Sequence, residues 1–292
     1  MQNLYTISTG SGVGEEKLTE AEIFSVLYHN FFDYPLSFSE MIRWRAGKFP
    51  KKSIDGVRVS NKNGYAYIEG KEGIVFKRML RKRISAKKLE IAKGASKILS
   101  FLPGVKMIAV TGSLAMGNAS DESDIDLMVI TKSGSLWTTR AFAYLLICLF
   151  GIKKRTPNKN YQKDALCLNM WLDESDLVWQ KKDRNIYTAH EIGQILPLIN
   201  EDKTYEKFLY ENRWILKFWP NAVRVQSIEY KVQSENFLST MYHVLGTLWE
   251  PIFFWLQYQH MRSKITREVV TPTRALFHPQ DWGRVVIGRL TT

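Results

Sequence analysis

The segment from Lys106 to Thr131 constrains the fold more than any other part of the chain. It holds two short apolar runs, 106–111 and 124–131, joined by a loop rich in glycine, serine and acidic residues. Runs of this length that are rich in β-branched residues predict strands. A helical run at 135–150 and a third apolar run at 164–172 follow. The order strand, loop, strand, helix, strand predicts a compact α+β unit in the middle of the chain.

Two aspartates stand at the start of the second strand. Asp124 and Asp126 are two residues apart, so their carboxylates point to the same face and can share one divalent cation or bridge two. Ile125 then points the other way, into the core. After the first strand, Gly112 allows a tight turn, and Ser113 offers a hydroxyl and free backbone N–H groups to anionic oxygens. Together these features suit a metal-assisted attack on a nucleoside triphosphate.

The whole string resembles the signature of the DNA polymerase β-type nucleotidyltransferase superfamily. It is most like the short form found in minimal nucleotidyltransferases, Gly-Ser-x-Ala-x-Gly-x-Ala-x-x-x-Ser-Asp-x-Asp-Leu. The resemblance implies a core of about 102–184 with a small mixed sheet flanked by helices. Every fixed position of the signature is filled, by Gly112, Ser113, Ala115, Gly117, Ala119, Ser123, Asp124, Asp126 and Leu127.

The resemblance also implies an activity and roles for these residues. The reaction would move a nucleoside monophosphate from a nucleoside triphosphate to an acceptor hydroxyl, with release of pyrophosphate. Asp124 and Asp126 would bind two Mg²⁺ ions, with Mn²⁺ as the alternative metal. Nucleotide binding would fall to the loop residues Gly112, Ser113, Gly117 and Ser123. Met116 departs from the pattern, because many minimal members carry arginine there.

A third carboxylate normally completes the metal site from a later strand. Asp164 is the candidate, because it begins the third predicted strand. Asn169 and Asp173 lie on or just after the same strand, and if Asn169 occupies the equivalent position the third carboxylate is missing. Lys132 and Arg140 follow the second strand and would supply positive charge to the triphosphate; a role on a helix surface is the alternative.

The net charge of +12 is concentrated in one stretch. The segment 77–97 holds nine lysines and arginines against one acid, Glu90. A run of this kind predicts either a phosphate-facing surface, for RNA, DNA or a polyphosphate, or simply a solvated helix face.

The segment 1–101 shows two helix starts and a hairpin. Thr19 with Glu22, and Ser37 with Glu40, form capping boxes at the starts of two short helices. Alternating residues around Asn63-Gly64 predict a β-hairpin. The order resembles a winged helix-turn-helix, although a third helix would have to fit into 50–55. An α+β adaptor without nucleic-acid contact is the alternative, and a long basic helix at 72–101 follows.

The segment 185–292 is predicted to be a helical domain. A third capping box is expected at Thr188 with Glu191, and helical runs at 208–219 and 237–261 are rich in aromatic residues. At helical spacing such residues are more typical of a core than of a base-stacking surface. The chain therefore divides into three predicted pieces, 1–101, 102–184 and 185–292.

Location and partners follow from what the sequence lacks. No basic cluster followed by an apolar run opens the chain, and the most hydrophobic stretch, 141–152, is shorter than the ~20 residues of a membrane span. Cys148 and Cys167 lie among apolar neighbours, as expected of reduced cysteines in the cytoplasm. Two hypotheses remain: a Mg²⁺-dependent nucleotidyltransferase, or a catalytically idle protein of the same fold that acts as a nucleic-acid-binding regulator.

Overall fold

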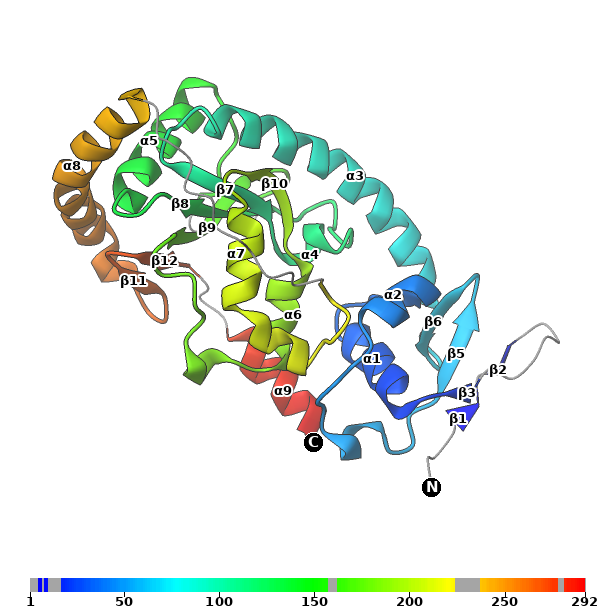
Figure 1. Ribbon diagram of the computed structural model, residues 1–292. Helices are drawn as coiled ribbons and strands as arrows, with labels where there is room; N and C mark the ends of the chain where they lie inside the picture. The colour runs from blue at the N-terminus through cyan, green and yellow to red at the C-terminus, as the bar shows by residue number, and fades with distance from the viewer. Residues whose placement is uncertain are drawn as a thin grey trace.

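A six-stranded mixed sheet lies at the centre of the computed structural model (Figure 1). The structure describes residues 5–6, 8–9, 17–156, 162–223, 237–277 and 281–291. The strand order is β10-β7-β8-β9-β12-β11, and β8 and β9 are parallel while the other neighbours are antiparallel. The mixed sheet implied by the resemblance is thus confirmed. The strands are β7 (Val105–Val110), β8 (Ile125–Thr131), β9 (Leu166–Asp173), β10 (Leu196–Asn200), β11 (Val269–Thr271) and β12 (Arg274–Leu276).

Both faces of the central strands are buried, which explains why β7 to β9 are almost uniformly apolar. Ile108 and Val129 contribute to a core with α3 (Gly73–Leu99), α5 (Leu136–Leu149) and part of α8 (Phe237–Met261). On the other face, residues such as Met128 pack with the N-terminal helices, α6 (Ile186–Gln194), α7 (Thr204–Glu211) and α9 (Trp282–Thr291). Segments from both ends of the chain therefore share one core with the sheet.

The segment 185–292 contains the predicted helices, but it is not exclusively helical. This part of the chain does form α6, α7, α8 and α9, but it also supplies β10, β11 and β12, which extend the sheet at both edges. Each of these strands is only three to five residues long, and β10 contains Pro197. A run of three to five residues shows too little alternation of apolar and polar residues to be distinguished from a loop in the sequence. The proline in β10 is tolerated because β10 is an edge strand.

The third predicted capping box is wrong. Asn185 is the N-cap of α6, and its side chain accepts a hydrogen bond from the Thr188 backbone N–H at 3.0 Å. Thr188 therefore lies inside the first turn, and Glu191 is in the middle of the helix. Asparagine and threonine are both common N-cap residues. Asn185 and Thr188, three residues apart, were therefore both possible starts for this helix in the sequence.

The predicted elements of the N-terminal segment are present. Thr19 caps α1 (Glu20–Asn30) and Ser37 caps α2 (Phe38–Arg43), each with a complete capping box. The hairpin pairs β5 (Val59–Lys62) with β6 (Tyr65–Ile68) through Asn63 and Gly64, both at positive φ as a type I′ turn requires. The remaining short elements are β1 (Tyr5–Thr6), β2 (Ser8–Thr9), β3 (Lys17–Leu18), β4 (Leu36–Ser37), α4 (Gly112–Ala115) and single 3₁₀ turns at Lys51–Ile54, Lys181–Asp183, Arg213–Lys217 and Arg262–Lys264.

The long helix α3 runs from the N-terminal hairpin to the central sheet (Figure 1). Its basic residues divide into two groups. Arg78, Arg81 and Lys88 turn inward, where Arg78 donates to the Met116 and Gly117 carbonyls at 3.1 and 2.9 Å. The exposed group is Lys77, Lys82, Arg83, Lys87, Lys93 and Lys97. Part of the basic run is thus structural, because it holds the loop between β7 and β8.

No helix in the described part of the chain is long and apolar enough to cross a membrane. The apolar stretch 141–152 instead forms most of α5, whose inner face packs on the sheet.

Candidate active site

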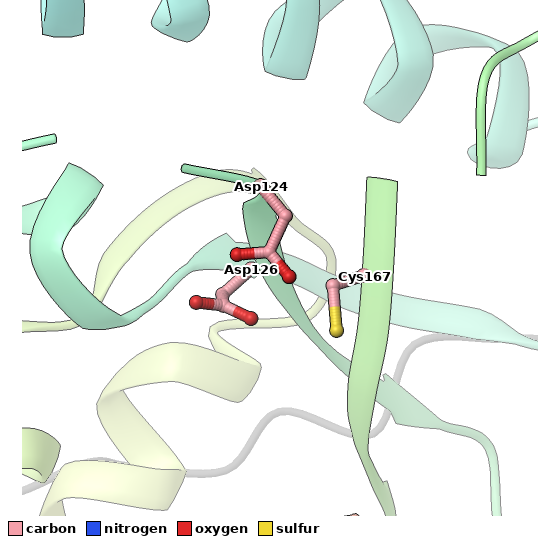
Figure 2. Close-up of side chains that lie close together, drawn as sticks. All are labelled: Asp124, Asp126 and Cys167. Carbon is pink, nitrogen blue, oxygen red and sulfur yellow. The ribbon is translucent and has the colours of Figure 1, made fainter. Parts of the chain in front are cut away.

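Asp124 and Asp126 lie side by side at the start of β8, as expected from their spacing (Figure 2). Asp126 is opposite Cys167 in the parallel register of β8 and β9. One oxygen from each carboxylate and the Cys167 sulfur all lie within 4.8 Å of one another. The pairing of β8 with β9 thus brings three potential metal ligands together. Asp124 and Asp126 were predicted from the sequence, whereas Cys167 was not.

The turn before these aspartates requires a glycine for two reasons. Gly112 has φ +60°, which other residues rarely adopt. A Cβ atom at this position would also lie only 3.0 Å from the Asp126 Oδ2 atom. The following turn closes through the Asn118 N–H, which donates to the Ser113 carbonyl at 2.8 Å, and through Gly117 at φ +62°. The loop of the signature is therefore folded back against the aspartates.

A cavity of about 610 Å³ opens in front of the aspartates, and we call it the first cavity. Most of its wall comes from the signature segment and β9, from the N-terminal residues 29–34 with Arg81, and from helix α6, and Arg155, Phe277 and Trp282 complete it. Residues of the wall include His29, Phe31, Phe32, Arg81, Gly112, Ser113, Asp124, Asp126, Arg155, Asn169, Tyr187, His190, Glu191 and Gln194. The flanking segments thus contribute to the site as well as to the fold.

Negative charge at the site is incompletely compensated. Burial and, to a lesser extent, the neighbouring Asp124 carboxylate together raise the pKa of Asp126 to about 7. Arg155 lies 3.2 Å from the Asp124 Oδ2 atom and donates to the Cys167 sulfur at 3.5 Å. Burial also raises the pKa of the Cys167 thiol, so the sulfur stays protonated. A divalent cation would relieve the repulsion between the two carboxylates.

The structure does not place Asp164 with the other aspartates. Asp164 has φ +58° in the turn before β9, and its carboxylate accepts a hydrogen bond from the buried Lys88 ammonium at 2.6 Å. Lys88 also donates to the Ser123 carbonyl at 2.7 Å. Lys88 therefore connects α3 to the loop before β8 and to the turn before β9. The sequence shows only that Asp164 precedes a strand, whereas the direction of its side chain depends on a partner 76 residues away.

Asn169, the alternative candidate, does lie at the site. Its Nδ2 donates to the Asp126 Oδ1 atom at 2.8 Å, and its Oδ1 atom is buried and has no hydrogen-bond partner among the described residues. Asp173 is at the other end of β9, where it accepts from the Gly134 N–H at 2.7 Å. At the site, β9 therefore contributes the Cys167 thiol and the Asn169 amide in place of the third carboxylate that the resemblance implied.

The donors present suit Mg²⁺ or Mn²⁺. Hard divalent cations prefer oxygen ligands, and the two carboxylates together with the orphaned Asn169 Oδ1 atom supply them. A protonated Cys167 thiol is a poor ligand for either ion.

Four predicted nucleotide-binding residues do not line the first cavity: Gly117, Ser123, Lys132 and Arg140. Arg140 donates a hydrogen bond to Gln257 and thereby connects α5 to α8. Its guanidinium group also lies against the rings of Tyr144 and Phe277. Lys132 is buried beyond the far end of β8. The Ser123 hydroxyl donates to the Ser120 carbonyl at 2.9 Å and stabilises the loop.

Sequence reasoning missed the two arginines that line the first cavity, Arg81 and Arg155. Arg81 was counted only within the basic run 77–97. Arg155 ends a short basic cluster after α5, and nothing in its local pattern pointed to β8. Long-range packing brings Arg155 to Asp124 at 3.2 Å and places Arg81 beside Asn118 in the wall of the cavity.

A buried histidine pair also closes the first cavity. His29 Nδ1 donates to the Ser25 carbonyl at 2.7 Å, so its Nε2 atom accepts from His190 Nε2 at 3.0 Å. Burial lowers the pKa of His29 to about 4, which keeps the pair neutral. This contact joins α1 to α6 across the cavity.

Comparison with known proteins agrees with this geometry. A family model described as "Nucleotidyltransferase domain" matches residues 92–184, from the last turns of α3 to the segment after β9. No curated protein and no solved structure matches the chain. The middle third of the chain is therefore a nucleotidyltransferase domain, consistent with the polymerase β-type superfamily.

Proposed function

We propose that the protein transfers a nucleoside monophosphate from a nucleoside triphosphate to an acceptor hydroxyl and releases pyrophosphate. The observation that carries the proposal is the pair Asp124 and Asp126, held against the Gly112-Ser113 turn at the wall of a cavity. Two adjacent carboxylates and a glycine-serine turn are what metal-assisted phosphoryl chemistry requires.

Each group at the first cavity has a role in this proposal. Asp124 and Asp126, with the Asn169 Oδ1 atom, would hold Mg²⁺ or Mn²⁺. The bound cation supplies charge neutralisation at the triphosphate and lowers the pKa of a coordinated hydroxyl. Ser113 would offer its hydroxyl and backbone N–H to phosphate oxygens, and Arg81 and Arg155, which line the same cavity, would add positive charge.

The first cavity has the dimensions of a nucleotide site. Its volume of about 610 Å³ lies within the usual range for small-ligand pockets. Phe31 and Phe32 contribute aromatic rings to its wall and suit an apolar base face, whereas the arginines and Ser113 suit phosphates. One cavity thus offers both kinds of surface that a nucleotide needs.

Label transfer tests the proposal. Purified protein is mixed with α-³²P-labelled ATP, CTP, GTP and UTP in turn, with Mg²⁺ or Mn²⁺, and with total RNA, total protein or a metabolite extract. We expect incorporation, with release of pyrophosphate, that EDTA abolishes. Asp124→Asn and Asp126→Asn should abolish it too, while Asp55→Asn, an exposed N-terminal control, should not. Equal incorporation by wild type and both site variants would refute the proposal.

A second candidate function has its own supporting observation. Cys167 and Asn169 stand where a third carboxylate is usual, and α3 exposes six basic residues beside the helix-turn-helix-like segment. A catalytically idle regulator that binds nucleic acid would account for both. Steeply salt-dependent binding of duplex DNA or RNA, unchanged by Asp124→Asn and without any label transfer, would favour this alternative.

A further inference from the structure

Glu191 lies on the wall between two cavities. A second cavity of about 620 Å³ adjoins the first, and both are lined by Glu191 and by the same four neighbours, Thr111, Met170, Tyr187 and Trp282. Asp124, Asp126 and Ser113 line only the first cavity. A group on the shared wall can therefore contact molecules in both cavities.

No structural partner accounts for a carboxylate at this position. Gln194 Nε2 donates to the Glu191 Oε1 atom at 2.8 Å, and no described lysine or arginine forms an ion pair with Glu191. The charged and titratable groups that face it are Asp126, Tyr28 and Tyr187. Burial, with Asp126, raises the pKa of Glu191 to about 7. A partly buried carboxylate without a cation costs stability, which is typical of functional sites.

Glu191 is not part of the cluster of potential metal ligands at the start of β8. The compact cluster within 4.8 Å contains Asp124, Asp126 and Cys167 but not Glu191, although Glu191 lines the same cavity. Glu191 therefore lines the same cavity as Asp124 and Asp126 without belonging to this cluster.

The second cavity suits a small acceptor. Trp179, Tyr187 and Trp282 line it together with aliphatic side chains. Its wall also carries charges of both signs, from Lys182, Arg267, Arg274, Arg284, Asp183, Asp281 and Glu191. A cavity of this volume accommodates a molecule of drug-like size rather than a nucleic-acid duplex.

We propose that the second cavity binds a small hydroxyl-bearing acceptor and that Glu191 takes the proton from its hydroxyl. The inference rests on the proposed nucleotidyl transfer. The acceptor oxygen forms a bond to the α-phosphorus, the bond between that phosphorus and the α,β-bridging oxygen breaks, and pyrophosphate leaves. The hydroxyl proton passes to the Glu191 carboxylate, so atoms and charges balance.

Water in the acceptor position provides a probe reaction for this role. The slow conversion of α-labelled ATP, CTP, GTP and UTP to monophosphate and pyrophosphate is measured with Mn²⁺ between pH 5 and 9. We expect the wild-type rate to rise with pH as Glu191 ionises and then to level. Glu191→Gln should slow the reaction about 100-fold and lose the rising limb. Glu191→Asp should retain that limb at a reduced rate, and the exposed control Glu206→Gln should match wild type.

Binding separates this role from that of a metal ligand. In calorimetric titrations with Mn²⁺ and nucleotide, Glu191→Gln should bind within about twofold of wild type, whereas Asp126→Asn should lose binding. Wild-type turnover in Glu191→Gln, or its loss of Mn²⁺ binding, would overturn the inference and leave the proposed function intact. Absence of metal-dependent turnover in the wild type would overturn both.

Discussion

Strands β8 and β9 are parallel neighbours in the same sheet, yet they contribute opposite chemistry to the first cavity. Asp126 and Cys167 are register partners, and Asp124 and Asn169 lie on the same side of the sheet. The β8 strand supplies two carboxylates, whereas β9 supplies a protonated thiol and an amide. Because packing fixes the position of both strands, the charge that a cation would meet depends on these four side chains and on Arg155, which lies 3.2 Å from Asp124.

The comparison explains why the site tolerates its own charge without a metal. Burial, together with the adjacent Asp124 carboxylate, already raises the pKa of Asp126 to about 7. A third on β9 would add further repulsion. The neutral pair on β9 therefore limits the electrostatic cost of folding, and it also lowers the charge available to a divalent cation.

Loss of a β8 carboxylate should have the largest effect. Asp126→Asn is expected to lower nucleotidyl transfer by ~10³-fold or more, because a metal ligand is lost while the fold is kept. Label-transfer rates with Mg²⁺ measure the effect, with Asp55→Asn as the control. A reduction of less than tenfold would show that β8 does not carry the chemistry.

A gain of charge on β9 should have the next largest effect. Asn169→Asp would place a third carboxylate beside Asp126, and we expect Mn²⁺ to bind roughly tenfold more tightly at pH 8. Calorimetry measures this affinity. Asn200→Asp, an exposed change on β10, should leave it unchanged. Unaltered affinity in Asn169→Asp would mean that β9 does not face the cation.

The stability of the metal-free protein should depend on pH through Asp126. Its pKa is about 7 in the folded chain and about 4 when unfolded, so the native state binds more protons between these values. The free energy of unfolding should therefore fall by up to ~4 kcal/mol as pH rises from 4 to 7, and then level. Urea denaturation across this range measures the change. Asp126→Asn should show a flatter profile; an unchanged slope would contradict the assignment.

Replacement of the Cys167 thiol on β9 should have the smallest effect on nucleotidyl transfer. Cys167→Ser keeps a small neutral group opposite Asp126, so transfer should change by less than about threefold. The same label-transfer assay applies. A large loss would show that the thiol takes part directly and that β9 is not chemically neutral.

Local sequence was sufficient to predict the signature segment. The turn at Gly112, the paired Asp124 and Asp126, and the strands around them depend on contacts within about twenty residues, and they are found where they were expected. The capping boxes at Thr19 and Ser37 are equally local.

The remaining site residues depend on long-range packing. Asp164 pairs with Lys88 because α3 crosses the loop before β9, and Arg155 reaches Asp124 from beyond α5. Glu191 lies at the site because β10 joins the edge of the sheet and holds α6 in front of it. None of these contacts leaves a periodic or spaced pattern in the chain, so a single sequence could not predict them.

A crystal structure with Mn²⁺ and a non-hydrolysable nucleoside triphosphate analogue would test the central claim most directly. The account predicts an anomalous Mn²⁺ peak bound by Asp124 and Asp126, with the triphosphate against Ser113 in the first cavity. An analogue bound elsewhere, or a cavity without Mn²⁺ at saturating concentrations of both, would contradict it.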